Sequence, residues 1–184
     1  MASHGLGFTL AALCALATPR AANADCTPAS LDGGRILVSN CFANCGVYQV
    51  GDPTGPDLHF GSNLPDVISF EFYSPDSGLP RTGTFDLGSG VNANYATCEQ
   101  CIIVYQDYID PATPTKTFFQ TAGSITIDSH TIPGVTAAIG LSWESVTLAE
   151  VTIEPDTFVS TLVPDGACYT IVVNDLVFRN GFEP

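Results

Sequence analysis

Six of the seven cysteines follow residue 24, and their spacing points first to covalent or metal chemistry. They are Cys26, Cys41, Cys45, Cys98, Cys101 and Cys168. An even number of cysteines in an exported chain is typical of a disulfide framework. Cys41 and Cys45 are close enough in sequence to pair locally, and so are Cys98 and Cys101. Cys26 is then left to pair with Cys168, and this longest loop predicts the most stabilising disulfide.

The segment Cys98-Glu99-Gln100-Cys101 also admits two other chemistries. A thioredoxin-like redox pair lies at a helix N-terminus, whereas an extended apolar run follows Cys101 here. Four thiolates could instead bind zinc if Cys41 and Cys45 joined the pair. An oxidising compartment, two further cysteines and the lack of a neighbouring histidine weigh against zinc. We favour the disulfide, with redox and zinc chemistry as alternatives.

Calcium is the metal that the composition favours, because carboxylates are plentiful in loops rich in glycine and proline. The candidates are Asp52, Asp57, Asp107 and Asp110. Carboxylate and carbonyl oxygens are the ligands that calcium prefers. None of these segments matches an EF-hand or a repeat-type calcium loop. We therefore expect either no cofactor or a calcium ion at these loops.

Residues suited to catalysis are sparse in this sequence. His59 and His130 lie in loop-like contexts, and neither stands beside a plausible nucleophile. The sequence contains no Gly-x-Ser-x-Gly elbow, phosphate-binding loop or His-Glu-x-x-His motif. A glycosidase-like site would have to be assembled from distant carboxylates such as Asp128, Glu144 and Glu150.

The elements that position these residues have the two-residue period of β-strands. Ile68, Phe70 and Phe72 alternate with polar residues, which predicts a half-buried strand. The segment 101–106 is apolar on both faces, as a central strand requires. Further strands are expected at 35–39, 47–50, 82–87, 117–120, 125–127, 138–148, 151–153 and 169–174, with a β-bulge at 144–145. The prediction is an all-β antiparallel sandwich or jelly-roll-like barrel with very little helix.

Composition and the first residues predict one exported domain. Residues 1–24 resemble a removable signal peptide, which leaves a single β domain at 25–174 and a peripheral tail at 175–184. No apolar run reaches the length of about 18 residues that a membrane helix needs. The net charge of −14 repels phosphate backbones, so nucleic acid is not expected as a partner.

Two parts of the sequence resemble known bacterial proteins. The segment 83–87, the run Asn94-Tyr95-Ala96-Thr97-Cys98 with Cys101, and the segment 116–120 followed by Gly123 are similar to uncharacterised exported proteins of Gram-negative soil bacteria. This likeness spans about residues 80–130. The ending at 178–183, FRNGFE, also resembles a tail of other secreted proteins of such bacteria. Neither resemblance implies an activity or catalytic residues.

Aromatic residues add one possible binding surface. Tyr95, Tyr105, Tyr108 and Trp143 could stack on a sugar, although aromatic residues in strands more often belong to the core. We expect an exported, noncatalytic module in the periplasm, on the cell surface or in the medium, which has a structural role or binds a protein or carbohydrate. The alternative is a secreted hydrolase. The sequence specifies no oligomeric state.

Overall fold

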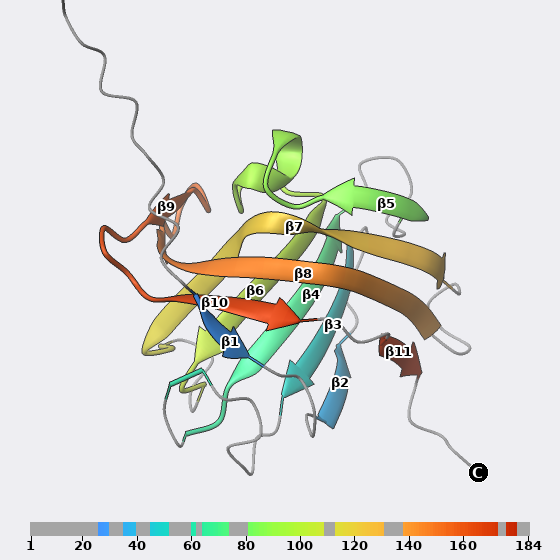
Figure 1. Cartoon of the computed structure of the whole chain (residues 1–184), viewed down its shortest axis with the longest axis horizontal. Helices are drawn as coiled ribbons and strands as arrows, with labels where there is room; N and C mark the ends of the chain where they lie inside the picture. The colour runs from blue at the N-terminus through green and yellow to red at the C-terminus, as the bar shows by residue number, and fades with distance from the viewer. Residues whose placement is uncertain are drawn as a thin grey trace, which may run out of the picture.

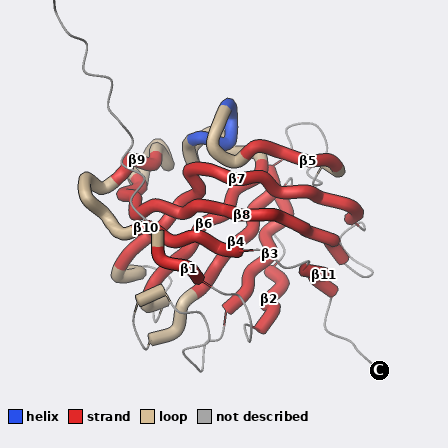
Figure 2. Tube along the Cα trace, in the orientation of Figure 1, coloured by secondary structure: helices blue, strands red, loops and turns tan. Residues whose placement is uncertain are grey.

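The computed structural model describes residues 26–29, 35–39, 45–51, 60–61, 64–73, 81–108, 113–130, 138–172 and 176–179. At 35–39, 45–51, 128–130, 138–140, 144 and 176–179 it describes the backbone alone. The elements in this part of the chain are β1 (Thr27–Ala29), β2 (Arg35–Ser39), β3 (Cys45–Gly51), β4 (Val67–Tyr73), β5 (Gly83–Asp86), the 3-10 turn η1 (Gly90–Ala93), β6 (Gln100–Gln106), β7 (Lys116–His130), β8 (Ala138–Ile153), β9 (Ser160–Leu162), β10 (Cys168–Val172) and β11 (Leu176–Arg179). Figure 2 shows how little of the described chain is helical. The predicted all-β class is confirmed.

These strands form one sheet, in the order β1-β10-β8-β7-β6-β4-β3-β2. In addition, β5 pairs with β7, and both β9 and β11 pair with β8. All described pairs are antiparallel except β1 with β10. In Figure 1, β8 and β10 run across β4 and β6.

The sheet is curved so strongly that side chains from distant strands meet on its inner face and form the main core. Phe70 of β4 and Trp143 of β8 belong to strands separated by two others, yet their ring centroids are 5.4 Å apart. We call this core the inner cluster. It contains Ala29, Phe60, Ile68, Phe70, Phe72, Leu87, Ile102, Val104, Phe118, Ile125, Ile127, Leu141, Trp143, Val146, Leu148, Tyr169 and Ile171. Burial of these apolar side chains is the main stabilising contribution to the fold.

The opposite face of β4 and β6 is also covered. We call this second core the outer cluster; its buried members are Cys98, Cys101, Ile103, Phe119 and Val151, and Tyr73, Tyr95, Tyr105 and Ile153 pack against it. The prediction that β6 is buried on both faces is therefore confirmed. For β4, however, the expectation of a half-buried strand is wrong, because Ser69 and Glu71 are buried as well.

The two longest strands replace four shorter ones that we expected from the sequence. The segments 117–120 and 125–127 join in β7, and the segments 138–148 and 151–153 join in β8. The expected bulge is present, since Trp143 pairs with Ile125 but Val146 pairs with Gly123. Gly123 has φ 109°, and a Cβ there would lie 2.1 Å from the Ser145 carbonyl oxygen. Only glycine therefore fits at this point, where β7 lies close to the backbone of β8.

Both ends of the described chain are attached to the sheet. A disulfide joins Cys26 to Cys168, with their Cα atoms 4.9 Å apart, beside the parallel pairing of β1 with β10. Part of the segment that we expected to be a peripheral tail forms β11, which pairs with β8. In the part of the chain that the structure describes, no helix has the length and apolar character needed to cross a lipid bilayer.

Candidate functional site

A groove of about 570 Å³ opens beside the outer cluster. It is lined by Tyr73, Tyr95, Ala96, Thr97, Cys98, Glu99 and Phe158. Tyr73 comes from the end of β4, the residues 95–99 from the loop between η1 and β6, and Phe158 from the loop between β8 and β9. Three segments that are distant in sequence thus meet at one surface hollow.

The loop 94–99 is fixed by polar contacts to β9. The Asn94 side chain accepts a hydrogen bond from the Ser160 N–H at 3.1 Å and donates to the Ser160 carbonyl at 2.9 Å. The Tyr95 N–H donates to Ser160 Oγ at 3.1 Å. Asn94 therefore occupies the backbone groups that an additional strand would use at Ser160. This arrangement both positions Tyr95 and blocks part of the β9 edge.

A buried network of three amide side chains supports the other end of the loop. Asn92 Oδ1 accepts hydrogen bonds from the N–H groups of Glu99 and Gln100, and Asn92 Nδ2 donates to Gln100 Oε1. Gln120 Oε1 accepts from the Ile102 N–H, and its Nε2 donates to the carbonyls of Asn92 and Gln100. A fully satisfied buried network of this kind rigidifies its surroundings. We assign it a structural role.

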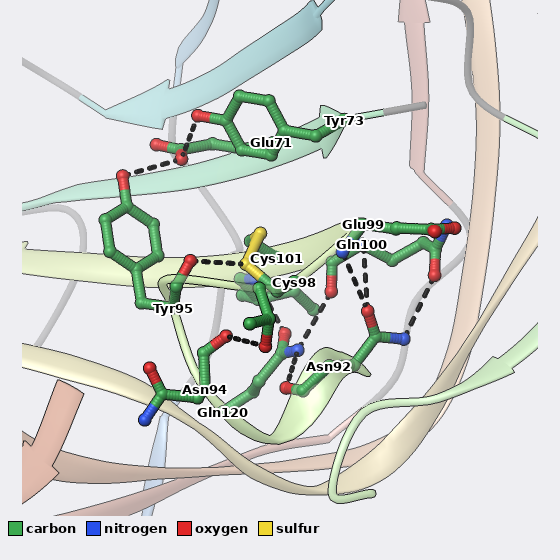
Figure 3. Close-up of a disulfide and its surroundings, with 12 residues drawn as sticks. Glu71, Tyr73, Asn92, Asn94, Tyr95, Cys98, Glu99, Gln100, Cys101 and Gln120 are labelled. Carbon is green, nitrogen blue, oxygen red and sulfur yellow. Dashed lines mark hydrogen bonds between the residues drawn. A yellow bond between two sulfur atoms is a disulfide. The ribbon is translucent and has the colours of Figure 1, made fainter. Parts of the chain in front are cut away.

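The disulfide Cys98–Cys101 completes the support of the loop, and its Cα atoms are 5.6 Å apart. Cys98 Sγ lies 3.3 Å from the Tyr95 carbonyl oxygen. Because both sulfurs are bonded to each other, this approach is a packing contact and involves no S–H donor. Cys98 also lines the groove. Figure 3 shows the disulfide beside Tyr95.

A buried carboxylate lies behind two of the groove tyrosines. Glu71 is 5% exposed and has three hydroxyl donors. Its Oε2 accepts from Tyr73 Oη at 2.8 Å and from Tyr95 Oη at 2.9 Å, while Oε1 accepts from Ser69 Oγ at 3.0 Å. Figure 3 shows both tyrosine hydroxyls pointing at Glu71. Both tyrosines thus line the groove, while their hydroxyl groups are held by a carboxylate that is not part of the lining.

The electrostatics of this cluster keep its tyrosines neutral. Desolvation by burial, and then the charge of Glu71, raise the pKa values of Tyr73, Tyr95 and Tyr105 well above the ordinary range for tyrosine. A neutral hydroxyl remains a hydrogen-bond donor, which is what the buried carboxylate requires. Tyr73 and Tyr95 are therefore fixed donors to Glu71 at ordinary pH.

Phe158 lines the groove in an unfavourable conformation. Its φ is 58°, and the residue is 56% exposed. Its N–H donates to the Glu154 carbonyl at 2.8 Å, which closes a turn that begins with Glu154. Glycine or asparagine is the usual residue at this left-handed position, and a bulky residue there is strained. The Phe158 ring centroid lies 6.4 Å from that of Tyr95.

The structure places the predicted disulfide residues as follows. Cys26 with Cys168 and Cys98 with Cys101 are two of the three pairs that spacing favours. Cys41 lies outside the described residues, and the Cys45 side chain is not among those described.

Only one of the calcium candidates can be located. Asp107 is buried, has φ 56°, and donates its N–H to Asp66 Oδ1 at 2.9 Å. Asp52, Asp57 and Asp110 lie outside the described residues. Among the side chains that the structure does describe, no three histidines, cysteines or acids are grouped to hold a metal ion. A calcium site stays a prediction.

Of the other candidate residues, the structure describes the side chain of Glu150 alone. Glu150 accepts from Lys116 Nζ at 2.8 Å and from the Ala167 N–H at 3.0 Å, and the hydrogen bond from Lys116 lowers its pKa. The side chains of Asp128, Glu144 and His130 are outside the described set, as is His59. A carboxylate held ionised in an ion pair is poorly suited to donate a proton.

Of the four aromatic candidates for sugar stacking, only Tyr95 lines the groove. Tyr105 and Tyr108 pack on each other, with ring centroids 5.6 Å apart, and Tyr105 also packs against the outer cluster. Trp143 belongs to the inner cluster and is therefore not part of a surface platform.

Sequence reasoning missed Glu71 and Phe158. In the sequence, Glu71 alternates with core residues and resembles an ordinary outward-facing acid. Its burial becomes evident only in the structure, where the outer cluster covers that face of β4. Phe158 did carry a signal, because it follows Pro155-Asp156-Thr157 at a point where a turn usually has glycine.

Comparison of the chain with protein-family models, curated protein sequences and solved structures gave no significant match. The function is therefore argued from the site.

Proposed function

We propose that this chain is an exported, noncatalytic binding module that acts in the periplasm, on the cell surface or in the medium. Its ligand, part of a protein or a carbohydrate, would bind in the groove between the loop 95–99 and Phe158. A groove of this size with aromatic walls and a few fixed polar groups is typical of a binding site for a small ligand or a protruding side chain.

The conformation of Phe158 is the observation that carries this proposal. A left-handed phenylalanine costs about 1–2 kcal/mol relative to an ordinary conformation. Its exposure means that the ring recovers only part of its burial energy in the free protein. Strain of this kind concentrates at binding and catalytic sites. A ligand that covers the ring would recover the remaining apolar burial.

The chemistry of the groove favours binding over turnover. The hydroxyls of Tyr73 and Tyr95 both donate to Glu71, and burial together with the Glu71 charge raises their pKa values. A general base needs a pKa near the working pH, and these tyrosines are far from it. Rigid aromatic rings lose little conformational entropy when they contact a ligand.

The disulfides support the proposed compartment. Cys26–Cys168 and Cys98–Cys101 are both closed in the structure. Such bonds persist in oxidising surroundings and are rare where glutathione keeps thiols reduced. The acidic composition also suits a soluble exported protein.

Glycan and peptide arrays probed with three forms of the protein would test this function. The forms are the unaltered protein, Phe158→Ala, and Leu162→Ala as a control. Leu162 is also exposed but lies outside the groove lining. We expect ligands that are lost with Phe158→Ala and retained with Leu162→Ala. If no ligand depends on Phe158, the groove is not the binding site. Hydrolysis of array glycans that is abolished by Glu150→Gln would instead establish the hydrolase alternative.

A further inference from the structure

We propose that the groove recognises an organic cation, such as a trimethylammonium group or a methylated amine on a larger ligand. This inference rests on the proposed function, because it names the ligand class of the same groove. It is carried by three aromatic residues that line the groove, Tyr73, Tyr95 and Phe158. One carboxylate, Glu99, lines the groove with them, and a second, Glu71, lies behind the two tyrosines.

The aromatic walls supply the first part of the argument. A cation over a ring face is attracted by the negative face of the ring quadrupole, and aromatic cages use this attraction to bind quaternary ammonium groups. Tyr95 and Phe158 meet nearly edge to face, with an interplanar angle of 73°. Rings at such an angle form two sides of a corner, and Tyr73 lines the same hollow.

Glu71 supplies the second part. Its carboxylate accepts from the hydroxyls of both groove tyrosines, and a phenol that donates to an anion shifts electron density into its ring. The ring faces of Tyr73 and Tyr95 therefore attract a cation more strongly. Among the described residues, Glu71 contacts hydroxyl donors and no cationic side chain. A buried carboxylate without a cationic partner favours the arrival of a positive charge nearby.

Glu99 supplies a second negative charge in the wall of the groove itself. Its Oε2 lies 3.6 Å from Arg81 Nη1, and the Arg81 side chain is 46% exposed. An exposed ion pair at this distance is weak and screened by salt, so it leaves Glu99 able to attract a ligand cation. The net charge of −14 also draws cations towards the protein.

The shape of the site argues against a bare metal ion. Calcium takes about six to eight oxygen ligands, whereas Glu99 is the one carboxylate among the residues that line the described groove. A methylated ammonium group is large and weakly hydrated, and its methyl surface packs on aromatic rings. The aromatic residues and the carboxylates at the groove thus suit both the apolar methyl groups and the positive charge of such a ligand.

Paired titrations of the disulfide-bonded protein test the inference. One ligand is choline, and the other is its neutral tert-butyl analogue, in which carbon replaces the charged nitrogen. Both are titrated at constant ionic strength and followed by calorimetry or NMR, which separates groove binding from general attraction to the acidic surface. We expect choline to bind about tenfold more tightly than the analogue, as for a cation partly desolvated on aromatic rings.

Three variants assign this preference to residues. Glu71→Gln keeps the shape but removes the charge, and should reduce choline affinity about three- to tenfold without changing binding of the analogue. Ser69→Ala removes a different donor to Glu71 and should retain the preference, so it controls for loosened packing. If Glu71→Gln does not fold, Phe158→Leu replaces the ring at an exposed position and should abolish the preference.

The outcomes separate this inference from the proposed function. Equal binding of choline and the analogue, lost together in Phe158→Leu, would overturn the cation inference and leave the groove as a binding site. Absence of choline binding would also overturn the inference, whereas Phe158-dependent ligands on the arrays would still support the groove. A preference for choline that survives both Glu71→Gln and Phe158→Leu would refute the assigned residues.

Discussion

The disulfide Cys26–Cys168 should stabilise the native protein more than Cys98–Cys101 because it closes a far longer loop. The sequence separations are 142 and 3 residues. In the loop-entropy model these lengths correspond to about 5 kcal/mol and about 2 kcal/mol, respectively. The difference of about 3 kcal/mol is a factor of more than about 100 in the unfolding equilibrium.

Simple substitution would not measure this difference cleanly. Cys98 and Cys101 are buried in the outer cluster, whereas Cys26 and Cys168 are half-buried. Removing buried sulfur atoms adds a packing loss to the loop effect, and serine would add the cost of burying a hydroxyl. The better experiment keeps the sulfurs in place. Two variants each retain one disulfide, with the other cysteines replaced by alanine, and each is compared in its oxidised and reduced forms.

Urea unfolding of these four forms gives the free energies required. Reduction of the variant that retains Cys26–Cys168 should lower the free energy of unfolding by about 5 kcal/mol, or leave it unfolded without urea. Reduction of the variant that retains Cys98–Cys101 should lower it by about 2 kcal/mol. Equal losses, or the opposite order, would refute the argument from loop length and would favour native-state contacts of the disulfides instead.

Three further predictions concern single contacts. Phe158→Gly should be about 1 kcal/mol more stable to urea than Phe158→Ala, because only glycine is unstrained at this φ; the reverse order would contradict the left-handed conformation. Tyr95→Phe should lower the free energy of unfolding by about 1.5–3 kcal/mol through the lost hydrogen bond to a charged acceptor, and equal losses in Tyr108→Phe would contradict this. The pKa of Glu150 is lowered in the folded protein, so its ion pair with Lys116 stabilises the fold above the unfolded pKa of a glutamate and loses this effect as the pH falls through the lower folded value. Lys116→Met should remove this pH dependence of the free energy of unfolding, which amounts to less than about 1 kcal/mol for a partly exposed pair. An unchanged dependence of stability on pH in Lys116→Met would contradict this argument.

The parts of the fold that depend on local patterns were predictable from the sequence. The alternation of Ile68, Phe70 and Phe72 identified β4, and the two apolar faces of β6 identified its central position. The phase change at 144–145 predicted the bulge in β8. In each case the side-chain period is a direct consequence of strand geometry, so neighbouring residues are sufficient to show it.

The length of β7 and the burial of Glu71 were not predictable in the same way. Polar residues and Gly123 interrupt the apolar pattern of β7. The strand nevertheless continues, because β7 stays paired with β8 on both sides of the interruption and bulges absorb the shifts in register. Glu71 is covered because the loop 94–99 folds over its face and supplies Tyr95 as a donor. These features depend on contacts between distant segments, which a period along the chain does not encode.

Stability alone does not explain Phe158, which lines the groove, or Glu71, which lies behind two of the groove tyrosines. Glu71 is a buried carboxylate that must be desolvated, and Phe158 combines strain with exposure of its ring. In a protein with only a structural role, one substitution at each position would remove the cost of desolvating Glu71 or of straining and exposing Phe158. Both residues nevertheless meet at Tyr95, whose hydroxyl donates to Glu71 at 2.9 Å and whose ring centroid lies 6.4 Å from that of Phe158. The desolvation of Glu71 and the strain of Phe158 are two independent costs at opposite ends of the Tyr95 side chain, and they support the proposal that the groove binds a ligand.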